Sequence, residues 1–101
     1  MKPVEITNSS GKTVGYLKYV HIYDLRDECI GFISGSDVID RHQNIIGRIG
    51  CLRIYDAQNN IVGFVASTKI FTTDNKIAGT CKISTLIGGG ALLLLLSKQT
   101  R

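Results

Sequence analysis

Residues 53–65 read RIYDAQNNIVGFV, and this stretch decides the fold because residues 21–33, HIYDLRDECIGFI, repeat its pattern position by position. Both stretches place an aspartate two residues after an apolar residue, and both follow a polar run with an apolar residue and a glycine. A fixed internal period constrains a fold more firmly than any local propensity. The chain is therefore a repeat sequence.

Glycines give the length of the repeat. Five of them follow at steps of sixteen residues (31 − 15 = 16), namely Gly15, Gly31, Gly47, Gly63 and Gly79. Apolar residues keep the same step at Ile6, Ile22, Val38, Ile54 and Ile70, before each glycine at Val14, Ile30, Ile46, Val62 and Ala78, and after it at Leu17, Ile33, Ile49, Val65 and Cys81. The chain thus contains five units, which we place at about residues 6–21, 22–37, 38–53, 54–69 and 70–85.

The pattern of each unit predicts a β-hairpin. In the stretch quoted above, a strand over 53–56 leads through a polar turn over 57–59 to a second strand over 61–65. A three-residue hairpin loop often ends in a left-handed residue, and the candidates are Gly11, Asp27, Gln43, Asn59 and Asn75. Gln43 is the exception among them and predicts a third turn that is either strained or built differently. Sixteen residues are too few for a strand, a crossover helix and a second strand, so we expect an antiparallel all-β fold.

The faces of the second strands predict how the hairpins meet. By simple alternation, Thr13, Cys29, Ile45, Ile61 and Ile77 share a face with the glycines, and the residues just before the glycines point the other way. A glycine in the middle of such a strand indicates either a close approach to a common axis or a β-bulge. Closing the ring, with the fifth unit beside the first, would remove exposed strand edges.

The stretches IYDLRDECIGFI, VIDRHQNIIGRI and IYDAQNNIVGFV resemble the five-fold β-flower proteins, a group of small bacterial proteins. The resemblance covers residues 6–81 and implies five hairpins around a pseudo-five-fold axis. It implies no activity and offers no catalytic residues. Asn8 and Thr72 depart from the aspartate of the pattern, so the ring is expected to be less regular where it begins and closes.

Length and composition predict one domain over residues 1–101 without a cofactor. Twelve Lys and Arg against eight Asp and Glu give a net charge of +4, spread without a basic run, so we expect no nucleic-acid partner. The first residues carry no apolar stretch of the secretory type, and a cytoplasmic location is expected. Three widely spaced cysteines indicate thiols and neither a disulfide framework nor a zinc site.

Two sets of residues are candidates for binding. Asp24, Asp40 and Asp56 occupy equivalent places and could hold a hard cation, although each could instead cap its own turn. Aromatic residues recur at Tyr16, Phe32 and Phe64 and at Tyr23, Tyr55 and Phe71, where they could stack on a sugar or base or fill a half-buried strand face. We take Tyr23, Tyr55, Phe71, Phe32 and Phe64 as the candidate ligand-binding residues.

The C-terminal segment 86–101 breaks the period. Residues 91–96 favour a helix after three glycines, and the apolar run over 86–96 is too short to span a bilayer. An apolar helix must be buried, so we expect it to plug the axis, cover one mouth of the ring or join two copies into a homo-oligomer. A strand that completes the ring and an interfacial membrane anchor are the competing forms.

These observations predict a non-enzymatic structural or protein-interaction module, with the chain itself or another protein as partner. The alternative is a small-ligand binder for a sugar, nucleotide or ion, which would use the axial mouth or the aromatic columns. His21 and His42 occupy different places in their units and have no partner that spacing would put beside them, so no catalytic residue is predicted.

Overall fold

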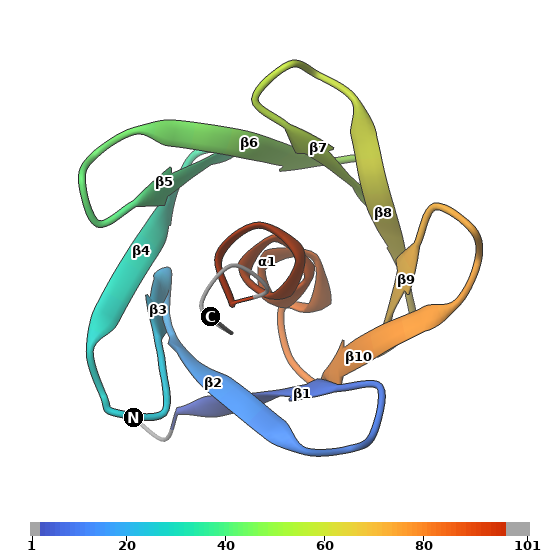
Figure 1. Ribbon diagram of the computed structural model, residues 1–101, viewed down its shortest axis with the longest axis horizontal. Coiled ribbons are helices and arrows are strands. Elements are labelled where there is room, and N and C mark those ends of the chain that lie inside the picture. The colour runs from blue at the N-terminus through green and yellow to red at the C-terminus, as the bar shows by residue number, and fades with distance from the viewer. Residues whose placement is uncertain (1–2, 97–101) are drawn as a thin grey trace.

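The five sequence units fold as five hairpins joined side by side into a closed antiparallel barrel (Figure 1). The structure is a computed structural model and describes residues 3–96. Its strands are β1 (Val4–Asn8), β2 (Thr13–Lys18), β3 (His21–Tyr23), β4 (Cys29–Ser34), β5 (Asp37–Asp40), β6 (Ile45–Gly50), β7 (Arg53–Asp56), β8 (Ile61–Ala66), β9 (Lys69–Thr72) and β10 (Ile77–Cys81). Each strand pairs with its neighbours in the chain, and β1 pairs with β10. The predicted all-β ring is confirmed.

The aspartates close the hairpin turns. In the fourth hairpin the Asp56 Oδ1 accepts hydrogen bonds from the backbone N–H groups of Gln58 and Asn60, both at 2.9 Å. Asn59, between them, adopts the left-handed conformation at φ 71°. The same conformation occurs at Gly11, Asp27, Gln43 and Asn75. All five predicted left-handed positions are therefore confirmed, including Gln43, which has neither the short polar side chain nor the missing Cβ that makes this conformation easy.

A β-bulge stands immediately before each repeated glycine. Ile54 lies opposite Gly63, whereas Tyr55 lies opposite Ile61, so Val62 is an extra residue in its strand. The other four hairpins shift register at the same place. The prediction that the Thr13, Cys29, Ile45, Ile61 and Ile77 column shares a face with the glycines is therefore wrong. The extra residue reverses the alternation of side chains, and this column lies outside the barrel while the glycines lie inside.

The inside of the barrel is built from the repeated apolar columns. Ile6, Ile22, Val38, Ile54 and Ile70 are all fully buried, and the column that follows the glycines is buried as well. On the outside, Ile45, Ile61 and Ile77 keep 55%, 46% and 44% of their surface exposed. The second strand of each hairpin thus has one core face and one open face, which the bulge makes possible.

The described part of the C-terminal segment, up to Leu96, forms a helix that fills the axis of the barrel (Figure 1). An α-helical part, α1 (Thr85–Gly90), continues as a π-helix, η1 (Ala91–Leu95). The helical prediction is confirmed, the alternative of a strand in the ring is wrong, and the segment plugs the axis. Among residues 3–96 no helix has the length and apolar character needed to cross a membrane.

Each repeated glycine faces one leucine of this helix. A Cβ built on Gly47 would lie 2.5 Å from the Leu94 Cδ1 atom, and one on Gly31 would lie 2.8 Å from the Leu95 Cδ1 atom. The full set of pairs is Gly79 with Leu92, Gly63 with Leu93, Gly47 with Leu94, Gly31 with Leu95 and Gly15 with Leu96. Each step of one residue toward the C-terminal end of the helix therefore moves the contact to the preceding hairpin of the ring.

The small residues at the start of the helix show the opposite arrangement. A Cβ on Gly88 would lie 2.5 Å from Cys81, and one on Gly90 would lie 2.9 Å from the Ile49 Cγ2 atom. Glycines of the helix thus face bulky residues of the ring, and leucines of the helix face glycines of the ring. The two predicted explanations of the glycine column, a β-bulge and a close approach to the axis, are therefore both confirmed. A bulge precedes each glycine, and a side chain on the axis approaches it.

The π-helix improves the angular match between successive leucines and successive hairpins. The Leu96 N–H group donates to the Ala91 carbonyl oxygen, five residues earlier, as a π-helix requires. Successive residues turn by about 100° in an α-helix and by roughly 80° in a π-helix, and five equal hairpins are ~72° apart (360°/5). The wider helix brings consecutive leucines closer to the spacing of the ring.

Candidate functional site

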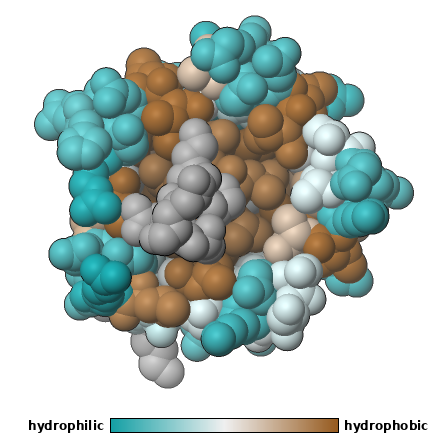
Figure 2. All heavy atoms as spheres, in the orientation of Figure 1, coloured by the Kyte–Doolittle hydropathy of each residue, from teal (hydrophilic) through white to brown (hydrophobic). Residues whose placement is uncertain are grey.

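The mouth of the barrel where the helix ends is apolar. Figure 2 shows apolar side chains gathered around the axis on this face, with polar hairpin turns outside them. A small concavity of about 240 Å³ opens here, lined by Ile30, Asp40, Arg41, His42, Ile46, Leu94 and Leu95. Leu94 and Leu95 of the plugging helix form its floor, so the described part of this mouth offers a shallow site.

The outer face of the barrel brings the two aromatic columns together. At each seam between neighbouring hairpins, one residue from either column stands opposite the other across the strand pair. The seams hold Tyr16 with Tyr23, Phe32 with Ile39, Arg48 with Tyr55, Phe64 with Phe71, and Thr80 with Thr7. The columns that recur separately in the sequence are therefore neighbours in the sheet.

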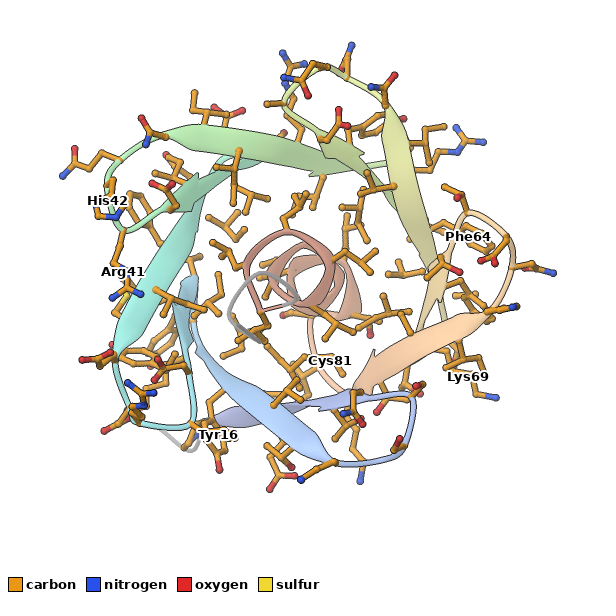
Figure 3. The ribbon with its side chains drawn as sticks, viewed as in Figure 1. Tyr16, Arg41, His42, Phe64, Lys69 and Cys81 are labelled. Carbon is orange, nitrogen blue, oxygen red and sulfur yellow. The ribbon has the colours of Figure 1, made fainter. Side chains whose placement is uncertain are left out.

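The seam between β8 and β9 carries a stacked aromatic pair. The ring centroids of Phe64 and Phe71 lie 5.1 Å apart, and the ring planes are 10° from parallel. Arg53 stands opposite Phe64 on β7, and Lys69 lies two residues before Phe71 on β9. Figure 3 shows Phe64 and Lys69 on the outside of the ring, in contrast to Cys81, which lies toward the axis.

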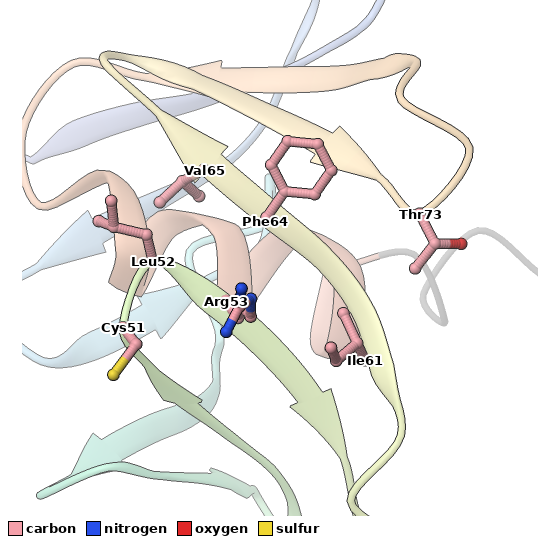
Figure 4. Close-up of a pocket in the computed structure, with 7 residues that line it drawn as sticks. All are labelled: Cys51, Leu52, Arg53, Ile61, Phe64, Val65 and Thr73. Atoms are coloured by element: carbon pink, nitrogen blue, oxygen red, sulfur yellow. The ribbon is translucent and has the colours of Figure 1, made fainter.

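A concavity of about 600 Å³ adjoins this pair (Figure 4). It is lined by Cys51, Leu52, Arg53, Ile61, Phe64, Val65 and Thr73. Leu52 and Ile61 are exposed at 60% and 46%. Arg53 forms no ion pair with any residue of the described range 3–96. We call the outer face of β7, β8 and β9, with Arg53, Ile61, Phe64, Lys69 and Phe71, the aromatic face.

The second group of predicted residues lies elsewhere and is engaged within the chain. Tyr23 and Phe32 belong to β3 and β4. The Lys18 Nζ atom lies 4.6 Å above the centre of the Tyr23 ring, and the His21 ring centroid is 6.0 Å from that of Phe32. Of the five candidate ligand-binding residues, the structure thus brings Tyr55, Phe64 and Phe71 onto adjacent strands and separates Tyr23 and Phe32 from them.

Sequence reasoning did not select Arg53, Leu52 or Thr73, which also line the concavity. Arg53 stands opposite Phe64 because the extra residue Val62 shifts the register between β7 and β8. Thr73 comes from the turn of the next hairpin. No motif in the sequence marks this group, because it forms across units.

The fold and the repeated glycines agree with the family comparison. The model of the 5-fold beta-flower proteins matches residues 4–92, from the first strand to the first leucine that faces a glycine. The chain belongs to this family. No curated protein and no solved structure matches it. Membership confirms the beta-flower architecture and assigns no activity.

The aspartates of this beta-flower protein lie on separate turns. The Asp40 Oδ1 accepts the N–H groups of His42 and Asn44 at 2.9 and 3.0 Å. Hydrogen bonds from the Asn44 backbone, opposed by desolvation and helped by the His42 backbone, hold the pKa of the Asp40 carboxyl below its usual value. Within residues 3–96, no three His, Cys, Asp or Glu side chains are grouped so that they could hold a metal ion. The geometry therefore favours turn capping for Asp24, Asp40 and Asp56, and metal binding stays a prediction.

The cysteines divide into two classes. Cys29 and Cys51 are exposed, and Cys81 is buried inside the beta-flower ring. Burial raises the pKa of the Cys81 thiol, and this is partly offset by hydrogen bonding with the Ile83 backbone. A buried thiol with a raised pKa is a poor nucleophile. Cys81 therefore acts as an apolar core residue.

Proposed function

We propose that this beta-flower protein is a non-enzymatic protein-interaction module that binds through its aromatic face. The stacked Phe64–Phe71 pair beside an open concavity carries the proposal. Large aromatic residues and arginine contribute most of the binding energy in many protein interfaces, above all where they sit together at the centre of the contact. The aromatic face combines both residue types with the exposed aliphatic side chain of Ile61.

Rigidity supports the same reading. Every strand of the described barrel is paired on both sides, and the axis is filled by α1 and η1. A partner therefore meets side chains and no open strand edge. A preorganised surface loses little conformational entropy on binding, which favours the use of a sheet face for recognition.

The aromatic face also carries positive charge. Arg53 and Lys69 lie on the aromatic face without an ion pair among residues 3–96, whereas Arg48 on the neighbouring seam is 3.9 Å from Asp37. Unpaired cations on such a face favour a partner with carboxylates and raise the rate of association. The partner surface should therefore combine apolar side chains with carboxylates.

A small-ligand site on the same face is the second candidate. The concavity of about 600 Å³ lies within the range of ligand pockets, about 300–1,000 Å³. It is open along the sheet, however, and Phe64 and Phe71 already cover one face of each other's ring. A panel of sugars and nucleotides in thermal-shift assays checks this candidate, since a ligand of this face should raise the melting temperature of the parent and not that of Phe64→Arg.

The repeat supplies matched controls for the test. A photo-reactive phenylalanine analogue is placed at position 61 or at position 45, which holds the equivalent exposed isoleucine of the third hairpin. Irradiation of cells that make the protein should give an adduct at position 61 and not at 45. Mass spectrometry then identifies the partner, and binding is repeated with the purified components.

Two further variants borrow residues from the third hairpin, so the fold should tolerate them. Phe64→Arg reproduces Arg48, and Arg53→Asp reproduces Asp37. Each should remove the adduct at position 61. Equal adducts at positions 61 and 45, or an adduct that survives both substitutions, would refute the proposal.

A further inference from the structure

The hairpin turn between β3 and β4 differs from the other four at its tip. Leu25 stands there with 59% of its surface exposed. The equivalent places in the other hairpins hold Ser9, Arg41, Ala57 and Thr73. No other turn thus offers a large aliphatic side chain at this position.

The same tip is acidic. Its sequence holds three acidic residues, Asp24, Asp27 and Glu28, and one basic residue, Arg26. The Asp24 Oδ1 is occupied by the turn, and Asp27 lies 3.8 Å from the Lys18 Nζ atom. Glu28 is exposed and forms no ion pair with any residue between positions 3 and 96. The tip therefore presents an exposed leucine with a carboxylate three residues later.

The aromatic face has the complementary properties. Its concavity is lined by the aliphatic side chains of Leu52 and Ile61 and by the ring of Phe64, with the cationic Arg53 between them (Figure 4). An apolar side chain fits the aliphatic walls, and a carboxylate beside it could pair with the guanidinium. The strands β7, β8 and β9 carry a single acidic residue, Asp56, whose Oδ1 already accepts two backbone N–H groups.

We infer that the partner of the aromatic face is a second copy of this chain, which inserts the Leu25 hairpin tip into the concavity. The inference rests on the proposed function and names its partner. Leu25 would contact Ile61 and Phe64 of the other copy, and Glu28 would pair with its Arg53. Residues 85–96 take no part, because their own ring holds them.

The two surfaces lie on different hairpins, so the contact is head to tail. Such a contact leaves one tip and one concavity free at the ends of a dimer, and further copies can add. A hairpin tip in a shallow concavity buries less area than a stable dimer needs, which is about 1,200 Å² or more. We therefore expect weak association, with a dissociation constant on the order of 100 µM.

Sedimentation of the purified full chain over a concentration series tests the inference. The parent should associate, and Leu25→Ala should weaken the association at least tenfold. Leu25→Ala reproduces the alanine of the fourth hairpin and leaves the core untouched. Arg41→Ala, at the equivalent tip of the third hairpin, is the matched control and should leave the association unchanged.

Charge exchange makes the test specific. Glu28→Lys reproduces Lys76 of the fifth hairpin, and Arg53→Asp reproduces Asp37 of the third. Each alone should reduce self-association at least tenfold, and an equimolar mixture of the two variants should associate again. The chain that carries both substitutions should associate about as well as the parent.

The outcomes separate this inference from the proposed function. A monomer up to about 1 mM, well above the expected constant, overturns the inference, as does association that Leu25→Ala and the charge exchange leave unchanged. In either case a different protein in the adduct at position 61 keeps the proposed function. An adduct with a second copy of the chain, lost in Leu25→Ala, supports both.

Discussion

Leu94 lies against Gly47 so closely that a Cβ atom on the glycine would be 2.5 Å from the leucine Cδ1 atom. The Tyr55 carbonyl oxygen of the neighbouring strand closes the other side of the same space. Two neighbours, one on the axis and one in the ring, thus leave no space for a side chain at Gly47. Four more glycine and leucine pairs repeat this relationship around the barrel.

Gly47→Val should destabilise the fold by about 3 kcal/mol or more, because an added side chain has to displace backbone as well as the helix. Gly50→Val is the matched control on the same strand, since a Cβ at Gly50 would meet nothing within 4 Å. Chemical denaturation compares the two variants with the parent. Equal stability of the parent and both variants would show that packing against the axial helix does not require a glycine at position 47.

Leu94→Ala should cost about 2–5 kcal/mol, the usual range for a buried leucine whose removal leaves a cavity. Only 3% of the Leu94 surface is exposed. Leu93→Ala, at a partly exposed position of the same helix, should cost less. Urea unfolding measures both, and a larger loss for Leu93→Ala would contradict the position of the helix in the ring.

Gln43→Asn should stabilise the protein by several tenths of a kcal/mol to about 1 kcal/mol, because asparagine tolerates the left-handed conformation better than glutamine. Gln43 has a φ of 69°, nearly the same as Asn59 at 71°. The reverse exchange, Asn59→Gln, should cost a similar amount. Thermal melting of the pair checks the sign, and a stabilising Asn59→Gln would count against the argument.

The stability of the parent relative to Asp40→Asn should fall in acid. The folded protein lowers the pKa of Asp40 below 3.8, so its carboxylate contributes stability above that pH, and the contribution is lost as the pH falls through the lowered value. Asparagine keeps a neutral acceptor in the turn at every pH, as Asn8 does in the first hairpin. Unfolding free energies measured at several pH values test this, and a constant difference would refute it.

Thiol labelling of the native protein should modify Cys29 and Cys51 and spare Cys81, which is buried and has a raised pKa. The third thiol should react only after unfolding. Cys81→Val introduces the valine that the fourth hairpin carries at the equivalent position, Val65. This variant should show the same two reactive thiols with and without denaturant. Rapid labelling of all three thiols in the native state would contradict the buried position.

The aromatic face and the position of the helix mark the limits of prediction from the sequence. The sequence predicts hairpins, turns and a closed ring, because those depend on residues within one unit or on its repetition. The bulge before each glycine changes which residues face outward, and its position depends on pairing between strands. Simple alternation therefore predicts Ile61 beside the glycines, whereas it lies outside, next to Arg53 and Phe64.

The sequence by itself determined the sixteen-residue module, its five copies and its turn residues, since local backbone sterics and polar side chains act within a few positions. Only the tertiary structure decided that Leu92–Leu96 face the five glycines one by one, and that Phe64 and Phe71 from different units stack. The first result depends on how the C-terminal helix sits in the ring, and the second on the register between β8 and β9. Close packing sets both, and it is satisfied only when the ring and its axis assemble together.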